Sequence, residues 1–329
     1  MTGKEFSKQS SVSLVTVYLG GPLPKYARTN LINTRKRFPN SRLVLISNHD
    51  SNRVFSEKNN IAFYRFQDYK NEFSKIKEKT SHPINFRKGF WIQTFLRFLA
   101  IAEFHTTCPN VEIIHFELDV ILFNNFPLET FSQIANDIAF PMVTSTTGVG
   151  SVIYFRNSKS SFEMAKFFRN RIAEDATSTD MTLLFNFYSQ KNALVSMLPI
   201  EDPNDLETPF HGIFDGATWG MFLTGTDPRN HRGWSYFHKK QISHIVNTDS
   251  RDLEIVGSLP YIQRQGGRST PIYNLHIHSK HNRFFEQEKL MKFLQSKKNR
   301  DMKPYQKFYL AIFIKAVFDS LIRRVSSDA

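Results

Sequence analysis

Two kinds of apolar pattern alternate along the first part of the chain. Short runs rich in β-branched residues, bounded by polar turn residues, predict strands at 12–19, 42–47 and 61–66. The segment 28–38, between the first two runs, has the pattern of a helix. Strands that alternate with helices predict an α/β domain with a parallel or mixed sheet.

The most informative pattern spans residues 88–123. Apolar residues recur at helical spacing from Lys88 to Phe104 and place Arg97 near the edge of a buried face. The segment 111–123 is almost continuously apolar, which is typical of a central strand buried on both faces, yet Glu117 and Asp119 lie near its end. Because side chains alternate along a strand, we expect these two acids to point to the same side.

The second half of the chain continues the α/β pattern. Pro, Gly, Asp and Asn are frequent in residues 199–233, so we expect a substrate-facing loop there. A last strand is predicted at 272–278, with His276 and His278 on one side of it. Other predicted elements are a helical stretch at 128–136, strands at 138–143 and 151–155, and helices at 161–172 and 180–188.

Composition and charge narrow the class of protein. With 329 residues, 40% of them hydrophobic, the chain is long enough for one large α/β domain or two smaller ones, and a disordered protein is excluded. The net charge of +13 favours anionic partners: nucleic acid, an anionic membrane surface or a phosphorylated small molecule. A single cysteine, Cys108, excludes a disulfide framework and a cysteine-rich zinc site.

No apolar run approaches the roughly 20 residues that a bilayer requires, and the N-terminal segment has the pattern of a first strand rather than of a signal peptide. We therefore expect a cytoplasmic protein, with a peripheral position on the inner face of a membrane left open.

The paired acids have two interpretations. Two carboxylates at a buried strand end repel each other and lose hydration, and a divalent cation removes that cost. Mg²⁺ or Mn²⁺ would bind such oxygens and keep positions open for phosphate oxygens. In the alternative, Asp119 caps a strand-end turn and Glu117 pairs with Arg97.

The arrangement of a strand, a helix carrying Arg97 and an apolar strand closing in Glu117-Leu118-Asp119 resembles the metal motif of the GT-A type nucleotide-sugar glycosyltransferases. The resemblance implies a single Rossmann-like domain at 1–285 with a mostly parallel central sheet. It also implies that Asp119 coordinates Mn²⁺ or Mg²⁺ and that Glu117 contacts the metal or the ribose.

The resemblance implies further roles. His278, or alternatively His276, would complete the metal shell, and Lys280 would contact the diphosphate. Gly20, Gly21 and Arg97 would lie at the nucleotide, although Arg97 is equally suited to an ion pair at the edge of the core.

Two looser matches concern the transferred sugar and the acceptor. Asp180 is similar to an acid that in several such transferases touches the sugar, and it also suits a helix N-cap. Asp215 is similar to an acid near the acceptor and is the first candidate for a general base, while Asp215-Gly216 is also a common turn pair.

These features predict a metal-dependent transfer of a sugar from a nucleoside diphosphate donor to a hydroxyl of a glycan or a lipid-linked acceptor, with no nucleic acid partner. The rivals are a basic protein that binds anionic lipid or nucleic acid without catalysis, and a nucleotidyltransferase that makes nucleotide sugars. Nucleotidyltransferases usually have a glycine-rich, basic phosphate-binding loop after the first strand, and this loop is not evident in the present sequence. The basic tail, 286–329, has an amphipathic pattern that suits a membrane surface or packing on the domain equally well.

Overall fold

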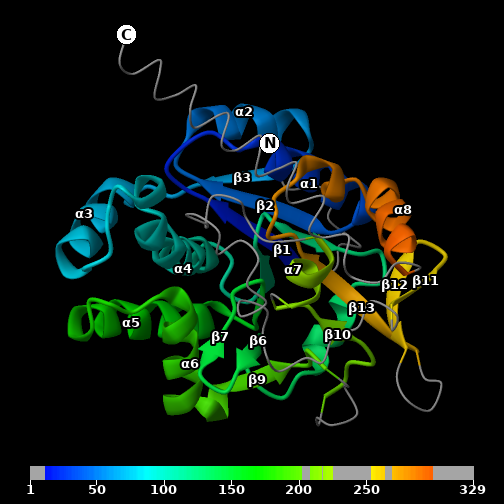
Figure 1. Cartoon of the computed structure of the whole chain (residues 1–329). Coiled ribbons are helices and arrows are strands. Elements are labelled where there is room, and N and C mark those ends of the chain that lie inside the picture. The colour runs from blue at the N-terminus through cyan, green and yellow to red at the C-terminus, as the bar shows by residue number, and fades with distance from the viewer. Residues whose placement is uncertain (1–11, 202–207, 217, 225–252, 264–268, 299–329) are drawn as a thin grey trace, which may run out of the picture.

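The computed structural model describes residues 12–201, 208–216, 218–224, 253–263 and 269–298 (Figure 1). An eight-stranded sheet forms the centre, in the order β3-β2-β1-β4-β8-β6-β7, with β9 paired to β6. Its strands are β1 (Val12–Tyr18), β2 (Arg42–Ser47), β3 (Ala62–Arg65), β4 (Glu112–Phe116), β6 (Ile138–Thr144), β7 (Thr147–Gly148), β8 (Val152–Phe155) and β9 (Val195–Leu198).

The β3-β2-β1-β4 half of this sheet is parallel throughout, and β6 and β9 are also parallel. The ladders of β8 with β4 and β6, and of β7 with β6, are antiparallel. The observed architecture confirms the predicted α/β class with a mostly parallel central sheet.

A second, five-stranded sheet packs beside the first. It has the order β10-β13-β12-β11, and β5 pairs with β13. Its strands are β5 (Val120–Leu122), β10 (Ile213–Phe214), β11 (Leu253–Val256), β12 (Leu259–Gln263) and β13 (Ser269–His276).

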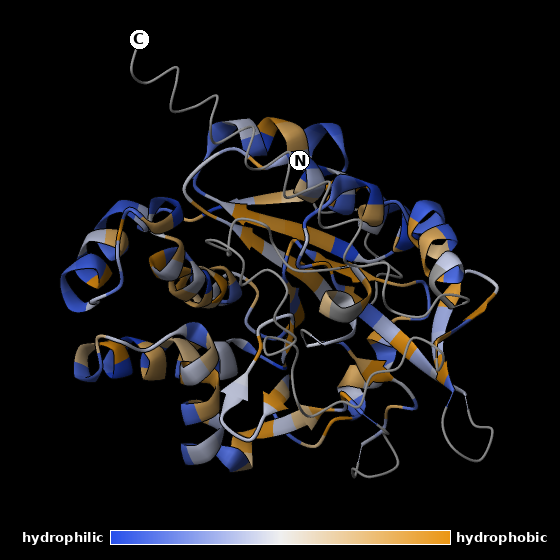
Figure 2. Ribbon diagram, in the orientation of Figure 1, coloured by the Kyte–Doolittle hydropathy of each residue, from blue (hydrophilic) through white to orange (hydrophobic). Residues whose placement is uncertain are grey.

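Helices cover both faces of the central sheet. Val15 of β1 packs in one hydrophobic cluster with Phe98 and Phe168, and the adjacent Leu14 packs in another with Leu31, because successive side chains of a buried strand point to opposite faces. The helices are α1 (Lys25–Arg37), α2 (Asp50–Lys58), α3 (Tyr69–Lys79), α4 (Phe90–Thr106), α5 (Ser158–Glu174), α6 (Asp180–Gln190), α7 (Trp219–Thr224) and α8 (Gln287–Lys298). Figure 2 shows largely hydrophobic central strands, whereas α1, α2, α3 and α8 carry hydrophilic stretches.

The single long strand predicted at 111–123 is wrong. The chain leaves the central sheet after Phe116, makes a turn closed by the Val120 N–H donating to the Glu117 carbonyl (2.9 Å), and enters the second sheet as β5. The run is largely apolar because its two strands pack in hydrophobic clusters, and the acids lie in the turn between the strands. We name residues 117–120 the acid turn.

Three smaller differences concern the other elements. The predicted last strand ends at His276, and the helical stretch at 128–136 is a 3₁₀ helix, Leu128–Gln133. Helices α2, α3 and α7 and strands β7 and β9 to β12 were not predicted, because they are short or mostly polar.

The beginning of the predicted tail forms α8, whose Leu290, Met291 and Leu294 are buried in the core of the second sheet. The amphipathic pattern further along the tail lies outside the described residues. Within the described part of the chain, none of the helices has the length and apolar character needed to cross a membrane.

Candidate active site

The candidate site lies where parallel strands of the central sheet end. Glu117 follows β4, Gly20 and Gly21 follow β1, and Asn48 follows β2. Because the carboxyl ends of parallel strands meet at one edge of the sheet, segments distant in sequence converge there.

The acid turn is held in place by backbone contacts and one buried amide. Asn30 of α1 is 0% exposed, and its Nδ2 donates to the carbonyl oxygens of Leu118 (3.1 Å) and Val120 (2.7 Å). The Ile277 N–H donates to the Asp119 carbonyl (2.7 Å), which ties the turn to the end of β13. Asn30 was not predicted as part of the site, because a single amide in a helix forms no recognisable pattern.

Three potential metal ligands meet at the acid turn. Glu117, Asp119 and His276 each offer a ligand atom, and these atoms lie within 4.8 Å of one another. His276 Nε2 is 3.4 Å from Glu117 Oε2 and 3.4 Å from Asp119 Oδ1. Lys280 Nζ is 2.9 Å from Asp119 Oδ2, so it neutralises the same carboxylate.

The carboxylates and the cations of this group shift one another's pKa values. Burial alone would raise the pKa of Asp119, but Lys280 and His276 beside it hold that pKa well below its usual range. Burial would lower the pKa of His276, but Asp119 and Glu117 raise it to about 9. Two carboxylates and one imidazole are a donor set that suits Mn²⁺, and a bound ion would take the place of the Nε2 proton of His276, so these residues fit the predicted ion.

The structure brings His276, not His278, into this group. Strand β13 ends at His276, and the His278 N–H donates back to the His276 carbonyl (3.0 Å) in a tight turn. The two imidazole rings therefore stack, with their centroids 4.0 Å apart. The sequence favoured His278 as the metal ligand and kept His276 as the alternative; in the structure His276 is the histidine near both carboxylates.

Arg97 joins the acid turn to α6. Its Nη1 bonds to Glu117 Oε1, and its Nη2 lies 2.6 Å from Asp180 Oδ2. Burial lowers the pKa of Arg97, but the two carboxylates outweigh burial and raise it. Glu117 thus uses one oxygen in the ion pair with Arg97 and turns the other toward His276.

Asp180 lies in the first turn of α6, and the N-cap of this helix is Thr179, which forms a capping box with Thr182. The Asp180 side chain is free of the capping role considered from the sequence. Burial raises its pKa despite the neighbouring Arg97.

Asp215 occupies a different environment from the one expected of a general base. It is 1% exposed, and its carboxylate accepts four backbone N–H groups. Oδ1 accepts from Thr218 (2.8 Å) and Trp219 (2.9 Å), and Oδ2 accepts from Gly220 (2.7 Å) and His276 (2.9 Å). Burial raises its pKa, against the effect of these bonds.

The described part of the predicted substrate loop forms β10 and α7, and it buries Phe210 and Phe214 in the core. Residues 202–207 and 225–252 lie outside the described part of the chain.

The glycine loop after β1 leaves space beside the site. Gly20 has φ +83, which favours glycine, and its N–H donates to Asn48 Oδ1 (2.9 Å). Buried Asn52 fixes the loop, since its Nδ2 donates to the Gly21 carbonyl (2.9 Å) and its Oδ1 accepts from the Leu23 N–H (2.8 Å). A Cβ on Gly21 would meet no described atom within 4 Å, whereas one on Gly20 would clash with Gln93 Nε2.

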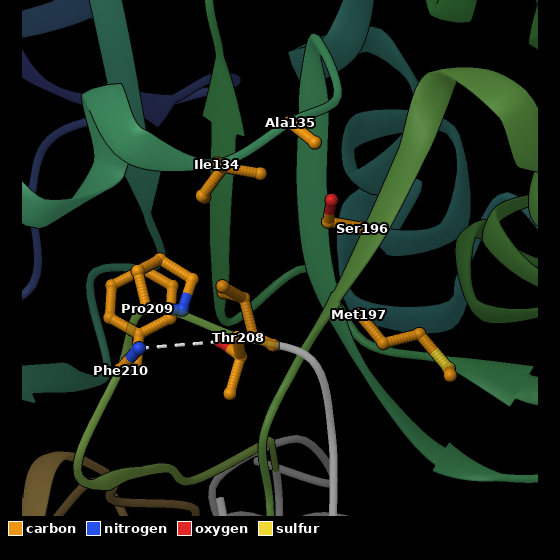
Figure 3. Close-up of a pocket in the computed structure, with 8 residues that line it drawn as sticks. Ile134, Ala135, Ser196, Met197, Thr208, Pro209 and Phe210 are labelled. Carbon is orange, nitrogen blue, oxygen red and sulfur yellow. Dashed lines mark hydrogen bonds between the residues drawn. The ribbon is translucent and has the colours of Figure 1, made fainter.

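A separate pocket of about 160 Å³ lies beside β9, the strand that pairs with β6 (Figure 3). Ser196 and Met197 of β9 and the segment from Thr208 to Phe210 line it, together with Ile134, Ala135 and Leu198. None of the predicted site residues is among these.

Comparison with known proteins gives structural neighbours only. No protein-family model and no curated protein matches the chain. Among similar solved structures are the PaToxG glycosyltransferase (TM-score 0.38, 11% identity, 55% of this chain and 70% of that chain) and the bifunctional glycosyltransferase WbbM (0.40, 13%, 76% and 48%). A cytidylyltransferase from Leptospira borgpetersenii is similar to the same degree (0.37, 10%, 59% and 77%).

This chain thus spans about half the length of WbbM. Glycosyltransferases and nucleotidyltransferases both occur among the neighbours, and the function proposed below depends on the geometry of the site.

Proposed function

We propose that the protein is a metal-dependent glycosyltransferase, which moves a sugar from a nucleoside diphosphate to a hydroxyl of a glycan or a lipid-linked acceptor. The observation that carries the proposal is the convergence of Glu117, Asp119, His276 and Lys280 at one edge of the sheet, in the acid turn and after β13. Anionic and cationic side chains in one small cluster suit a ligand that is itself a metal–diphosphate pair.

In this proposal Asp119, Glu117 and His276 hold Mn²⁺ or Mg²⁺. When bound, the ion would neutralise negative charge that develops on the departing diphosphate. Lys280 now pairs with Asp119, and it is a cation within reach of the same region. We expect it to exchange this carboxylate for a diphosphate oxygen when metal and nucleotide bind, because the metal then neutralises Asp119.

The remaining predicted residues have roles around this centre. The open backbone at Gly21 lets the nucleoside approach closely, and Asn52 keeps that backbone fixed. Arg97 orients Glu117 toward the metal group and Asp180 toward the neighbouring space that the sugar would occupy. Asp180 is the acid that we assign to the sugar side.

Calorimetry with UDP, GDP, CDP and dTDP, each with and without Mn²⁺, tests the proposal. We expect one nucleotide to bind at least ~10-fold more tightly with Mn²⁺, and Asp119→Asn to abolish this enhancement because it removes a charged ligand. Asp68→Asn, at an exposed position on another element, is the control and should retain the enhancement. Absence of metal-enhanced binding for every nucleotide would favour the non-catalytic binding protein instead.

A product assay separates the two transferase classes. Glycosyl transfer breaks the bond between the sugar and the diphosphate and releases a nucleoside diphosphate. Nucleotidyl transfer to a sugar phosphate consumes a nucleoside triphosphate and releases pyrophosphate. Release of pyrophosphate, with no nucleoside diphosphate formed from nucleotide sugars, would refute the proposed reaction.

A further inference from the structure

The ring of His276 is held by one backbone carbonyl. Its Nδ1 lies 2.7 Å from the carbonyl oxygen of Gly216. A carbonyl oxygen only accepts, so Nδ1 carries a proton, and Nε2 is the atom directed at Glu117 and Asp119. The orientation that suits metal binding therefore depends on where the Gly216 carbonyl lies.

The position of that carbonyl is set by Asp215 and Asn274. The Asn274 side chain, 0% exposed, accepts from the Asp215 N–H (3.2 Å) and donates to the Asp215 carbonyl (3.0 Å). The Asp215 carboxylate binds the first N–H groups of α7 and the backbone N–H of His276 itself. One side chain thus fixes both the segment that carries Gly216 and the backbone of the histidine.

Close packing leaves this arrangement little freedom. A Cβ on Gly220 would lie 1.9 Å from the carbonyl oxygen of His276, so α7 is in direct contact with the end of β13. The Asp215 oxygens are both engaged by backbone donors, and the side chain is almost fully buried. A carboxylate in this state has neither the exposure nor the free lone pairs to take a proton from an acceptor hydroxyl.

We propose that Asp215 is a positioning residue for His276, which acts with Asn274 and through the Gly216 carbonyl to keep Nε2 available as a metal ligand, and that it is not the general base. This inference rests on the metal site of the proposed function. It replaces the role that the sequence indicated for Asp215.

The experiment compares Asp215→Asn, Asn274→Ala and the wild-type protein by two measurements that need no substrate. Manganese binding is followed by electron paramagnetic resonance, and the hydrogen bond of His276 Nδ1 to the Gly216 carbonyl by ¹⁵N NMR of the metal-free protein. We expect both variants to weaken Mn²⁺ binding by about 10- to 100-fold, as loss of an outer-shell partner commonly does. Both variants should also shift the ¹⁵N signal of His276 Nδ1, because the hydrogen bond from Nδ1 to the Gly216 carbonyl is weakened. Asp137→Asn, on the loop before β6, is the control and should change neither measurement.

Activity then separates positioning from base catalysis. If Asp215 positions His276, saturating Mn²⁺ restores most of the turnover of Asp215→Asn. A general base predicts unchanged Mn²⁺ affinity and a turnover that stays about 100-fold or more below wild type at saturating metal. That result would overturn the inference.

Asn274→Ala leaves the carboxylate intact and provides the test should Asp215→Asn fail to fold. Unchanged metal affinity and an unchanged ¹⁵N spectrum in Asn274→Ala would also refute the inference. If no nucleotide binds at all, the proposed function fails, while the metal and NMR measurements still decide the role of Asp215.

Discussion

Two buried asparagines, Asn30 and Asn52, permit a paired test of how the site is built. Each is 0% exposed and donates from Nδ2 to a backbone carbonyl, but Asn30 holds the acid turn and Asn52 holds the glycine loop. Replacement by leucine has a similar volume, adds no charge and removes the donor. The two variants should therefore affect different halves of the site.

The magnitude follows from the bonds lost. Asn30 makes two bonds to the acid turn, at 3.1 and 2.7 Å, and a buried hydrogen bond contributes about 0.5–1.5 kcal/mol, so Asn30→Leu should cost about 1–3 kcal/mol. A loosened acid turn should weaken Mn²⁺ binding by about 10- to 100-fold, as other outer-shell changes do. Asn52→Leu loses three hydrogen bonds and should cost about 1.5–4.5 kcal/mol, yet leave Mn²⁺ affinity unchanged.

Metal affinity by electron paramagnetic resonance, nucleotide affinity by calorimetry without metal, and thermal melting would be measured for both variants. We expect Asn30→Leu to lose metal affinity selectively and Asn52→Leu to lose metal-free nucleotide affinity selectively. Equal losses of both affinities in both variants would show a general loss of structure. Unchanged metal affinity in Asn30→Leu, with an altered melting temperature, would refute the role of Asn30 in the site.

Three other predictions concern single contacts. Lys280→Met should weaken nucleoside diphosphate binding by about 10- to 100-fold, because one charged hydrogen bond is lost. Mn²⁺ alone should bind at least as tightly as before, because a cation that competes at Asp119 is removed. Weaker binding of Mn²⁺ alone, measured by calorimetry, would contradict this prediction. Arg97→Met should destabilise the fold by about 3–5 kcal/mol in denaturant unfolding, since it leaves Glu117 and Asp180 without their shared cation; adding Asp180→Leu should recover part of the loss, and no recovery would disprove the coupling. Burial lowers the pKa of His105, so the folded protein binds fewer protons there than the unfolded chain, and the free energy of unfolding should fall as the pH drops below about 6.5. Between pH 5 and 6.5, this free energy should depend less steeply on pH in His105→Gln than in the wild-type protein. Equal slopes would refute the prediction.

The central sheet was predictable from sequence because its strands are short apolar runs with clear polar boundaries. The run at 42–47 coincides with β2, and the helical spacing at 88–104 lies within two residues of the bounds of α4. Glu117 and Asp119 could be predicted as site residues because they are charged residues within an otherwise largely apolar segment.

The path of the chain at the acid turn was not predictable in the same way. An apolar run that passes from one core to another has the same pattern as a single buried strand, and only tertiary structure distinguishes them.

The supporting amides gave no signal either. Asn30 and Asn274 are single polar residues whose partners are backbone atoms far away in the sequence, and a backbone carbonyl has no residue identity. The choice between His276 and His278 depended on where β13 ends, and element boundaries are set by contacts rather than by composition.

The change of sheet at the acid turn has a consequence for assembly. Asp119 stands where the chain leaves the first sheet, and His276 ends a strand of the second that is synthesised much later. A cation held by both would join the two sheets in addition to the hydrophobic cluster that they share, and it would stabilise the native state in proportion to the logarithm of its concentration. Removal of the ion with a chelator should lower the melting temperature of both sheets together. Binding of the ion would then indicate that β13, which is synthesised late, has docked on the first sheet.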